Sequence, residues 1–248
     1  MKRNSFFLLS WALVIPVFLL YTNCKSDKNR AHTILQKSIK SHGGMELWKK
    51  MKSINYLKKT TLYTDSGLVE QKISQKIIHQ WKPNFTKITW MNQGKLYQAQ
   101  KSNKELRYFE GNALQSDPSV LKQINKNLDA SLYVFWQPFK LLDPAAKLEY
   151  VGLKKLLDTL AVHAIKVYYT EDKKGDVWTY FFDEKSYRLR ATQVDHEKRS
   201  SLIINEEVED QTGLFLNKKR KSYFLDSLGK INYLRAAYTY QINSFELR

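Results

Sequence analysis

The chain has 248 residues, of which 43% are hydrophobic and 13% aromatic, and its formal net charge is +17 at pH 7. This composition can form a sizeable folded core, and a single cysteine excludes any disulfide within the chain. Neither a recognition helix nor an aromatic-basic RNA-binding pattern accompanies the charge, so we predict no nucleic-acid partner. For an exported protein, anionic lipid head groups are the more common partner of a basic surface.

The N-terminal residues are typical of an exported protein. Lys2 and Arg3 precede an apolar run from Phe6 to Leu20, which is shorter than the roughly twenty residues of a membrane-spanning helix. The segment that ends this run, Leu20-Tyr21-Thr22-Asn23-Cys24, resembles the lipobox of bacterial lipoproteins. The resemblance implies that residues 1–23 are a signal peptide and that the Cys24 thiol is acylated. The alternative is a secreted protein with an incidental thiol.

The first predicted helix follows a polar tether. Lys25 to Arg30 is short and polar, and we predict that it separates the domain from the membrane. Apolar residues then recur at steps of three and four from Ala31 to His42, and Gly43-Gly44 ends the helix. A histidine at a helix end more often bonds to backbone carbonyls than to a ligand, and we predict this for His42. The residue after Cys24 is Lys25, not the acidic residue that retains lipoproteins at the inner membrane of enteric bacteria. By that analogy the sequence favours the outer membrane, but it does not indicate which face of that membrane the domain occupies.

From residue 53 onward, most of the chain shows the two-residue alternation of β-strands. Short polar turns such as Asp65-Ser66-Gly67 join these strands, as in an antiparallel meander. We predict about eleven strands in one mainly β domain over residues 31–248. The segment Lys218-Lys219-Arg220-Lys221 is predicted to be a solvated strand edge that discourages aggregation.

One helix interrupts the strands in mid-chain. Asp117 is a good N-cap, Pro118 suits the first helical position, and apolar residues recur at helical spacing from Val120 to Phe135. A helix with such a stripe needs a sheet to lie on. Beyond Pro138 the chain cannot stay helical, and the apolar segment around Phe139 either packs in the core or contacts a ligand.

The strand Val177 to Phe182 is apolar on both faces. Trp178, Tyr180 and Phe182 share one face, whereas Phe181 lies on the other. A sheet of this kind must be covered on both sides or wrap around something, and packed core is the more common reading. Our candidates for the lining of a ligand cavity are Trp90, Phe139, Trp178, Tyr180 and Phe182.

Three parts of the chain together resemble a known family. They are Asp176–Arg190, the Thr212-Gly213-Leu214 turn with Lys219-Arg220 and Tyr223 after it, and Pro138-Phe139. With the N-terminal helix and the strand meander, they resemble the LolA/LolB-type lipoprotein-sorting superfamily. The resemblance implies an incomplete antiparallel barrel of about eleven strands whose concave face is closed by helices. In known members the enclosed apolar cavity holds acyl chains of lipoproteins or other lipids.

Residues typical of catalysis are few. Asp195 and His196 are neighbours on a predicted strand, so their side chains point to opposite faces. His163 shares a strand face with Ile165 and Val167 and is predicted to be a core or rim residue. The chain has no Gly-x-Ser-x-Gly, no His-Glu-x-x-His and no phosphate-binding loop. We therefore predict no catalytic residues, no metal site and no cofactor.

These observations favour one function and leave a second open. The first is a membrane-anchored lipoprotein that binds a lipid or an acyl chain in an apolar cavity, with Cys24 as its lipidated residue. The alternative is a non-catalytic envelope interaction protein with a filled barrel core. Its basic surface would dock to the membrane or to envelope partners. The sequence predicts no oligomeric state.

Overall fold

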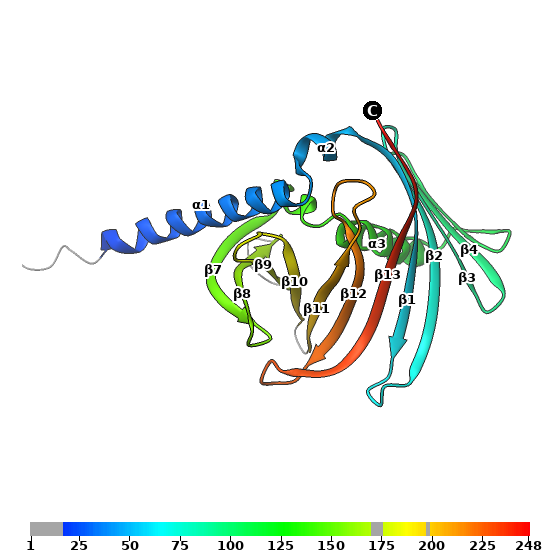
Figure 1. The fold of residues 1–248 in the computed structure, drawn as a ribbon. Coiled ribbons are helices and arrows are strands. Elements are labelled where there is room, and N and C mark those ends of the chain that lie inside the picture. Colours follow the sequence, from blue (N-terminus) through cyan, green and yellow to red (C-terminus); the bar gives the residue numbers. More distant parts are fainter. Residues whose placement is uncertain (1–16, 170–175, 197–198) are drawn as a thin grey trace, which may run out of the picture.

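The computed structural model describes residues 17–169, 176–196 and 199–248, and it shows one strongly curved antiparallel sheet with helices on its inner side (Figure 1). Most of the predicted signal peptide lies outside these residues. The strands are β1 (Met51–Tyr63), β2 (Val69–Trp81), β3 (Asn84–Asn92), β4 (Lys95–Ser102), β5 (Leu106–Glu110), β6 (Ala113–Gln115), β7 (Lys147–Leu156), β8 (Leu160–Tyr168), β9 (Val177–Asp183), β10 (Leu189–His196), β11 (Arg199–Val208), β12 (Asn217–Leu225) and β13 (Ile231–Leu247). The helices are α1 (Val17–Ser41), α2 (Gly44–Lys50), α3 (Pro118–Phe135) and the 3₁₀ turn η1 (Phe139–Leu142).

The thirteen strands form one open sheet in the order β6-β5-β4-β3-β2-β1-β13-β12-β11-β10-β9-β8-β7. Its two edges, β6 and β7, do not pair with one another, so the barrel is incomplete, as predicted. The strand count exceeds the predicted number, and residues 106–115 form two short strands, β5 and β6. Gly111 makes the turn between β5 and β6 with a positive φ of 63°.

The segment Lys218–Lys221 does not form a strand edge, and this prediction is wrong. It belongs to β12, which pairs with β11 on one side and with β13 on the other. The sequence alternation identified a strand but contains no information on which strands are its neighbours. Lys219 and Lys221 bond to Glu207 and Glu206 on β11, at 2.5 and 2.7 Å, so these charges are paired across the sheet.

The N-terminal helix is longer than predicted. It begins at Val17 rather than at Ala31, and the predicted tether, Lys25–Arg30, is helical. Between Val17 and Ser41 the sequence has no glycine or proline that would stop a helix. Its C-terminal part packs beside β7, whereas its N-terminal part extends beyond the sheet (Figure 1). Among the residues described, no helix combines the length and the apolar character needed to cross a membrane.

The end of α1 fits closely against the loop between β11 and β12. Gly43 has a φ of 99°, and a Cβ placed on it would lie 2.1 Å from the carbonyl oxygen of Gly213. Only glycine therefore allows this approach, which seats the loop on the helix end. As predicted, His42 bonds to the helix backbone: its Nδ1 lies 2.8 Å from the carbonyl oxygen of Ser38.

Helix α3 begins as predicted, with Asp117 as its N-cap. The carboxylate of Asp117 accepts hydrogen bonds from the backbone N–H groups of Ser119 and Val120. The helix ends at Phe135, and the chain then turns through η1. The apolar stripe of α3 faces the sheet, with Leu128 and Phe135 fully buried.

Most buried apolar residues lie on the concave side, between the sheet and the helices. They include Leu35 and Ile39 of α1, Phe135 of α3, Tyr56 and Ile77 of the N-terminal strands, and Tyr180, Phe182 and Tyr240 of the C-terminal strands. A smaller cluster lies on the other face of the sheet. Phe181 packs there, against buried residues such as Ala191 and Leu202. Both faces of the predicted two-faced strand therefore pack against apolar neighbours, the outer face only against side chains of adjoining strands.

Aromatic side chains fill the concave side below α2. The ring of Trp48 stacks on that of Phe139 with centroids 4.7 Å apart, and it meets Trp136 edge-on at 5.2 Å. Trp81 contacts both of these rings, with its centroid 4.9 Å from that of Trp136 and 5.5 Å from that of Trp48. This end of the half-barrel is solidly packed, so any space for a ligand lies further along α3.

Candidate functional site

A cavity of about 510 Å³ lies between α3 and the inner side of the sheet. Its floor crosses seven neighbouring strands, from β2 to β9, and its roof is the C-terminal half of α3. The residues that line it are Lys58, Gln75, Asn127, Ala130, Ser131, Val134, Trp178, Val194, His196, Ser201, Ile203, Arg220, Ser222, Tyr238 and Tyr240. The volume falls within the range of roughly 300 to 1,000 Å³ that is typical of small-molecule sites.

A second space of about 80 Å³ adjoins this cavity under the middle of α3. The two spaces share Gln75, Asn127 and Ser131 as lining residues. The remaining walls of the smaller space are apolar: Ile88, Trp90, Ala99, Ile124 and Leu128. Because they share these residues, the two spaces lie next to one another along α3, and we refer to them together as the channel, with its more polar part over β10–β13 and its apolar part over β2–β4.

The predicted cavity residues divide into two groups. Trp178 lines the larger space and Trp90 the smaller one, where Trp90 stacks on Tyr97 with centroids 5.5 Å apart. Tyr180, Phe182 and Phe139 share the concave side but are fully buried in the packed core, and they line neither space. The alternation of the strand placed Trp178, Tyr180 and Phe182 on one face, but only packing decides which part of that face is open.

The hydroxyl of Tyr180 takes part in a buried polar cluster. It accepts a hydrogen bond from Nε2 of Gln137 at 3.1 Å and lies 3.1 Å from the hydroxyl of Tyr133. Burial raises the pKa of the Tyr180 hydroxyl well above its usual value, so the group stays protonated. It therefore connects β9 to the end of α3 and is not suited to proton transfer.

Sequence reasoning missed Arg220 as a cavity residue, because it assigned the residue to a solvated edge. Arg220 is only 3% exposed and lines the larger space. Its Nε donates a hydrogen bond to Oδ1 of Asn205 at 2.8 Å. The alternation within Lys218–Lys221 could have shown that Arg220 faces away from Lys219 and Lys221. It could not have shown that its face is the concave one.

Three histidines of the described chain, His42, His79 and His163, are held by structural contacts. Nδ1 of His79 lies 2.9 Å from Oγ1 of Thr86, and Nδ1 of His163 lies 3.2 Å from the hydroxyl of Tyr150. Burial lowers the pKa of both His42 and His79 to about 4, so these two imidazoles are neutral at pH 7.

The neighbours Asp195 and His196 do not act as a pair. Nδ1 of His196 bonds to the carboxylate of Asp176, whereas Asp195 accepts a hydrogen bond from Nε2 of Gln193 at 2.8 Å. Among the described residues, no three His, Cys, Asp or Glu side chains are grouped so that they could share a metal ion.

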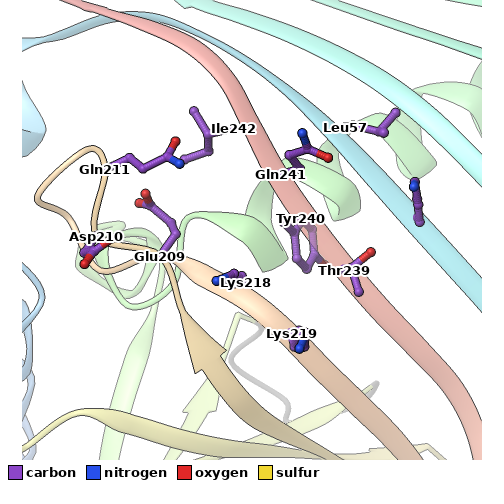
Figure 2. Close-up of a pocket in the computed structure, with 11 residues that line it drawn as sticks. Leu57, Glu209, Asp210, Gln211, Lys218, Lys219, Thr239, Tyr240, Gln241 and Ile242 are labelled. Atoms are coloured by element: carbon purple, nitrogen blue, oxygen red, sulfur yellow. The ribbon is translucent and has the colours of Figure 1, made fainter.

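Another cavity, of about 310 Å³, lies where β12 and β13 separate (Figure 2). Figure 2 shows Glu209 and Gln211 on the β11–β12 loop extending toward Ile242, with Asp210 on the same loop. The Glu209 carboxylate is already used by the loop, since it accepts hydrogen bonds from the hydroxyl and the backbone N–H of Thr212. With acidic and basic side chains mixed along its wall, this hollow offers an acyl chain less apolar surface than the channel does.

Three solved structures share this fold at low sequence identity. A LolA superfamily protein from Nitrosomonas europaea has a TM-score of 0.52 and 8% identity, over 88% of this chain and 93% of that chain. A DUF1329 family protein from Desulfovibrio piger has a TM-score of 0.50 and 8% identity, over 88% and 92%. A domain described as an outer membrane lipoprotein-sorting protein, from Vibrio parahaemolyticus, has a TM-score of 0.50 and 7% identity, over 89% and 93%. The fold is LolA-like, as the resemblance predicted.

Comparison of the sequence finds no curated relative, but it does identify the family. No curated protein matches the chain significantly. A protein family described as "Family of unknown function (DUF6503)" matches residues 9–241, which is nearly the whole chain. The protein therefore belongs to the DUF6503 family.

Proposed function

We propose that this protein is a non-catalytic lipoprotein of the bacterial cell envelope that holds an acyl chain in the channel beneath α3. The observation that carries the proposal is the pair of adjoining spaces under this helix, about 510 and 80 Å³ in volume. Five of the eight residues that line the smaller one are aliphatic or aromatic. Each methylene transferred from water into such a space contributes roughly 0.8 kcal/mol, so a long chain binds without any covalent chemistry.

The LolA-like fold supports the same proposal. A structural relative of this chain is described as an outer membrane lipoprotein-sorting protein, although at 7% identity it shares the fold alone. The formal charge of +15 that remains without Lys2 and Arg3 suits a surface that works next to anionic lipid. We propose that the protein is located at the outer membrane, on either its periplasmic or its outer face.

The test is native mass spectrometry of the purified protein before and after lipid extraction. We expect bound lipid before extraction and its loss afterwards. Ser131 lines both spaces, so Ser131→Trp should fill the channel and abolish the bound mass. Lys126→Trp places the same ring on the exposed side of α3 and serves as the control, which should retain lipid. If the unmodified protein carries no lipid and binds no added fatty acid or fatty alcohol, the carrier function is wrong.

The aromatic end of the half-barrel favours a second candidate, an envelope interaction protein without a ligand. Trp136, Phe135 and Tyr56 are fully buried there, and the rings of Tyr56 and Phe135 stack with centroids 4.1 Å apart. Such packing stabilises the fold without any bound lipid. Under this candidate Ser131→Trp and Lys126→Trp would leave lipid binding equally unchanged, because neither would compete with a ligand.

Lipidation of Cys24 is the part of the proposal that concerns the anchor. We expect that the Cys24→Ser protein loses metabolic palmitate labelling and leaves the membrane fraction, because the chain has no other thiol to acylate. Ser26→Ala, two residues further on, is the control and should keep both the label and the membrane association. Palmitate labelling of the Cys24→Ser protein would contradict the anchor.

A further inference from the structure

Arg220 is a buried cation without a counter-ion. The residue is 3% exposed, and within the described part of the chain its guanidinium forms no ion pair. Its neighbours on β12 differ in this respect, since Lys219 and Lys221 point to the other face and bond to Glu207 and Glu206. Burying an uncompensated charge destabilises a fold, so an unpaired arginine inside a cavity indicates that something else supplies the negative charge.

The hydrogen bonds around Arg220 fix its orientation. Asn205 is its register partner on β11, and Oδ1 of Asn205 accepts from Nε of Arg220. The amide nitrogen of Asn205 donates to the carbonyl oxygen of Leu189 at 3.1 Å, so the amide is held with its oxygen toward the arginine. The Nη groups have no hydrogen-bond acceptor among the residues described. Arg220 therefore presents to the cavity the forked pair of donors that suits an oxyanion.

The rest of the described cavity wall contains a second cation, Lys58, and no carboxylate. Lys58 and His196 also line it, and Lys58 Nζ lies 5.6 Å from the centre of the Tyr238 ring. Burial raises the pKa of Tyr238, so its hydroxyl is neutral at pH 7. No aspartate or glutamate belongs to the described lining. His196 is bonded to Asp176, which leaves Arg220 and Lys58 as the charges that a ligand can meet.

We propose that Arg220 binds the anionic head of an amphiphile whose acyl chain runs along α3 into the apolar space beside Trp90. The ligand class is an acyl chain with an oxyanion head, either a carboxylate or a phosphate, in contrast to a neutral lipid. Lys58 lies on the same wall and adds to the attraction. The inference rests on the proposed carrier function and adds to it a ligand class and the residue that selects it.

Binding of three probes with the same sixteen-carbon chain tests the inference: hexadecanoate, hexadecyl phosphate and hexadecanol. For the unmodified protein we expect at least one acid to bind about tenfold or more tightly than the alcohol, the range expected for hydrogen bonds to a charged group. A preference for hexadecanoate would indicate a fatty-acid head, and a preference for hexadecyl phosphate a phospholipid-type head. Equal affinity for all three probes would overturn the assignment of Arg220 and leave the carrier function intact. Absence of binding by any probe would instead reject the carrier function.

The variants separate charge recognition from folding. Arg220→Met should lose the preference for the acids and keep the affinity for hexadecanol, whereas Arg220→Lys should retain part of the preference. Lys221→Met removes the same charge from the opposite face of β12 and should behave as the unmodified protein. Met removes a buried charge without a counter-ion, but it also removes the donor to Oδ1 of Asn205. These two effects oppose one another, so we expect only a small change in the melting temperature of the ligand-free protein. An Arg220→Met protein that keeps the full acid preference would contradict the proposal.

Discussion

Replacement of Phe182 by alanine is expected to lower the free energy of unfolding by about 3 to 5 kcal/mol, the usual cost of removing a buried aromatic ring. The Phe182 side chain is fully buried in the main core and lies beside its register neighbours His163 and Leu189. Denaturant unfolding measures the loss, which should appear as a lower midpoint with an unchanged slope.

Trp178→Ala on the same strand face is the matched comparison. Trp178 lines the open channel and is only partly buried, so its removal enlarges a space that already exists. We expect a smaller loss of stability than for Phe182→Ala, together with weaker binding of a fluorescent fatty acid. Phe181→Ala, in the small cluster on the other face, controls for loss of packing without contact to the channel. Equal destabilisation by all three substitutions, with no probe bound by the unmodified protein, would favour the filled core.

Acidification is the second change with a large expected effect. His42 and His79 have pKa values of about 4 in the folded protein, chiefly because burial disfavours the charged imidazole, against 6.5 for the ordinary side chain. Between pH 6.5 and 4 the unfolded chain binds protons that the folded protein does not, so stability must fall as the pH falls through this window. At pH 4.5 we expect a loss on the order of 2 kcal/mol for each histidine relative to pH 7.

Histidine variants isolate this effect from the titration of carboxylates. His42→Gln keeps a donor near the Ser38 carbonyl, and His79→Gln keeps a partner for Thr86, but neither variant can titrate. The measurement is the free energy of unfolding at pH 7 and at pH 4.5. The double variant should lose less stability on acidification than the unmodified protein. Equal losses in the two proteins would show that these imidazoles do not control the acid sensitivity.

Local sequence patterns predicted individual helices and strands, but they contain no information on the order of the strands in the sheet. Asp117-Pro118 identified the start of α3, and the alternation from Val177 to Phe182 identified the strand that has apolar side chains on both faces. The start of α1 was wrong because composition alone made Lys25–Arg30 resemble a loop. The lipoprotein-sorting resemblance, not the pattern of any single strand, supplied the open barrel.

The candidate site was predicted only in part, for a physical reason. Trp90 and Trp178 line the channel, whereas Phe139, Tyr180 and Phe182 fill the core, and all five are aromatic residues on apolar faces. Whether such a face meets a space or another ring depends on where α3 and the aromatic cluster of α2 lie, and this is a tertiary property. Arg220 was missed because a basic run suggests a solvated edge until the neighbours of its strand are known.

The pairing of β1 with β13 has a consequence for the way this sheet folds. Every other ladder joins strands that are consecutive in the chain, whereas this one pairs Met51 with Leu247 and Leu62 with Ala236. Local hairpins close quickly, but contacts between distant residues must first overcome a larger loss of chain entropy. The two halves of the sheet therefore have time to form separately, with β1 as an unpaired edge until the C-terminal strand arrives. For a chain synthesised from its N-terminus, the centre of the finished sheet is the last part to close and the part most exposed to misassociation before then.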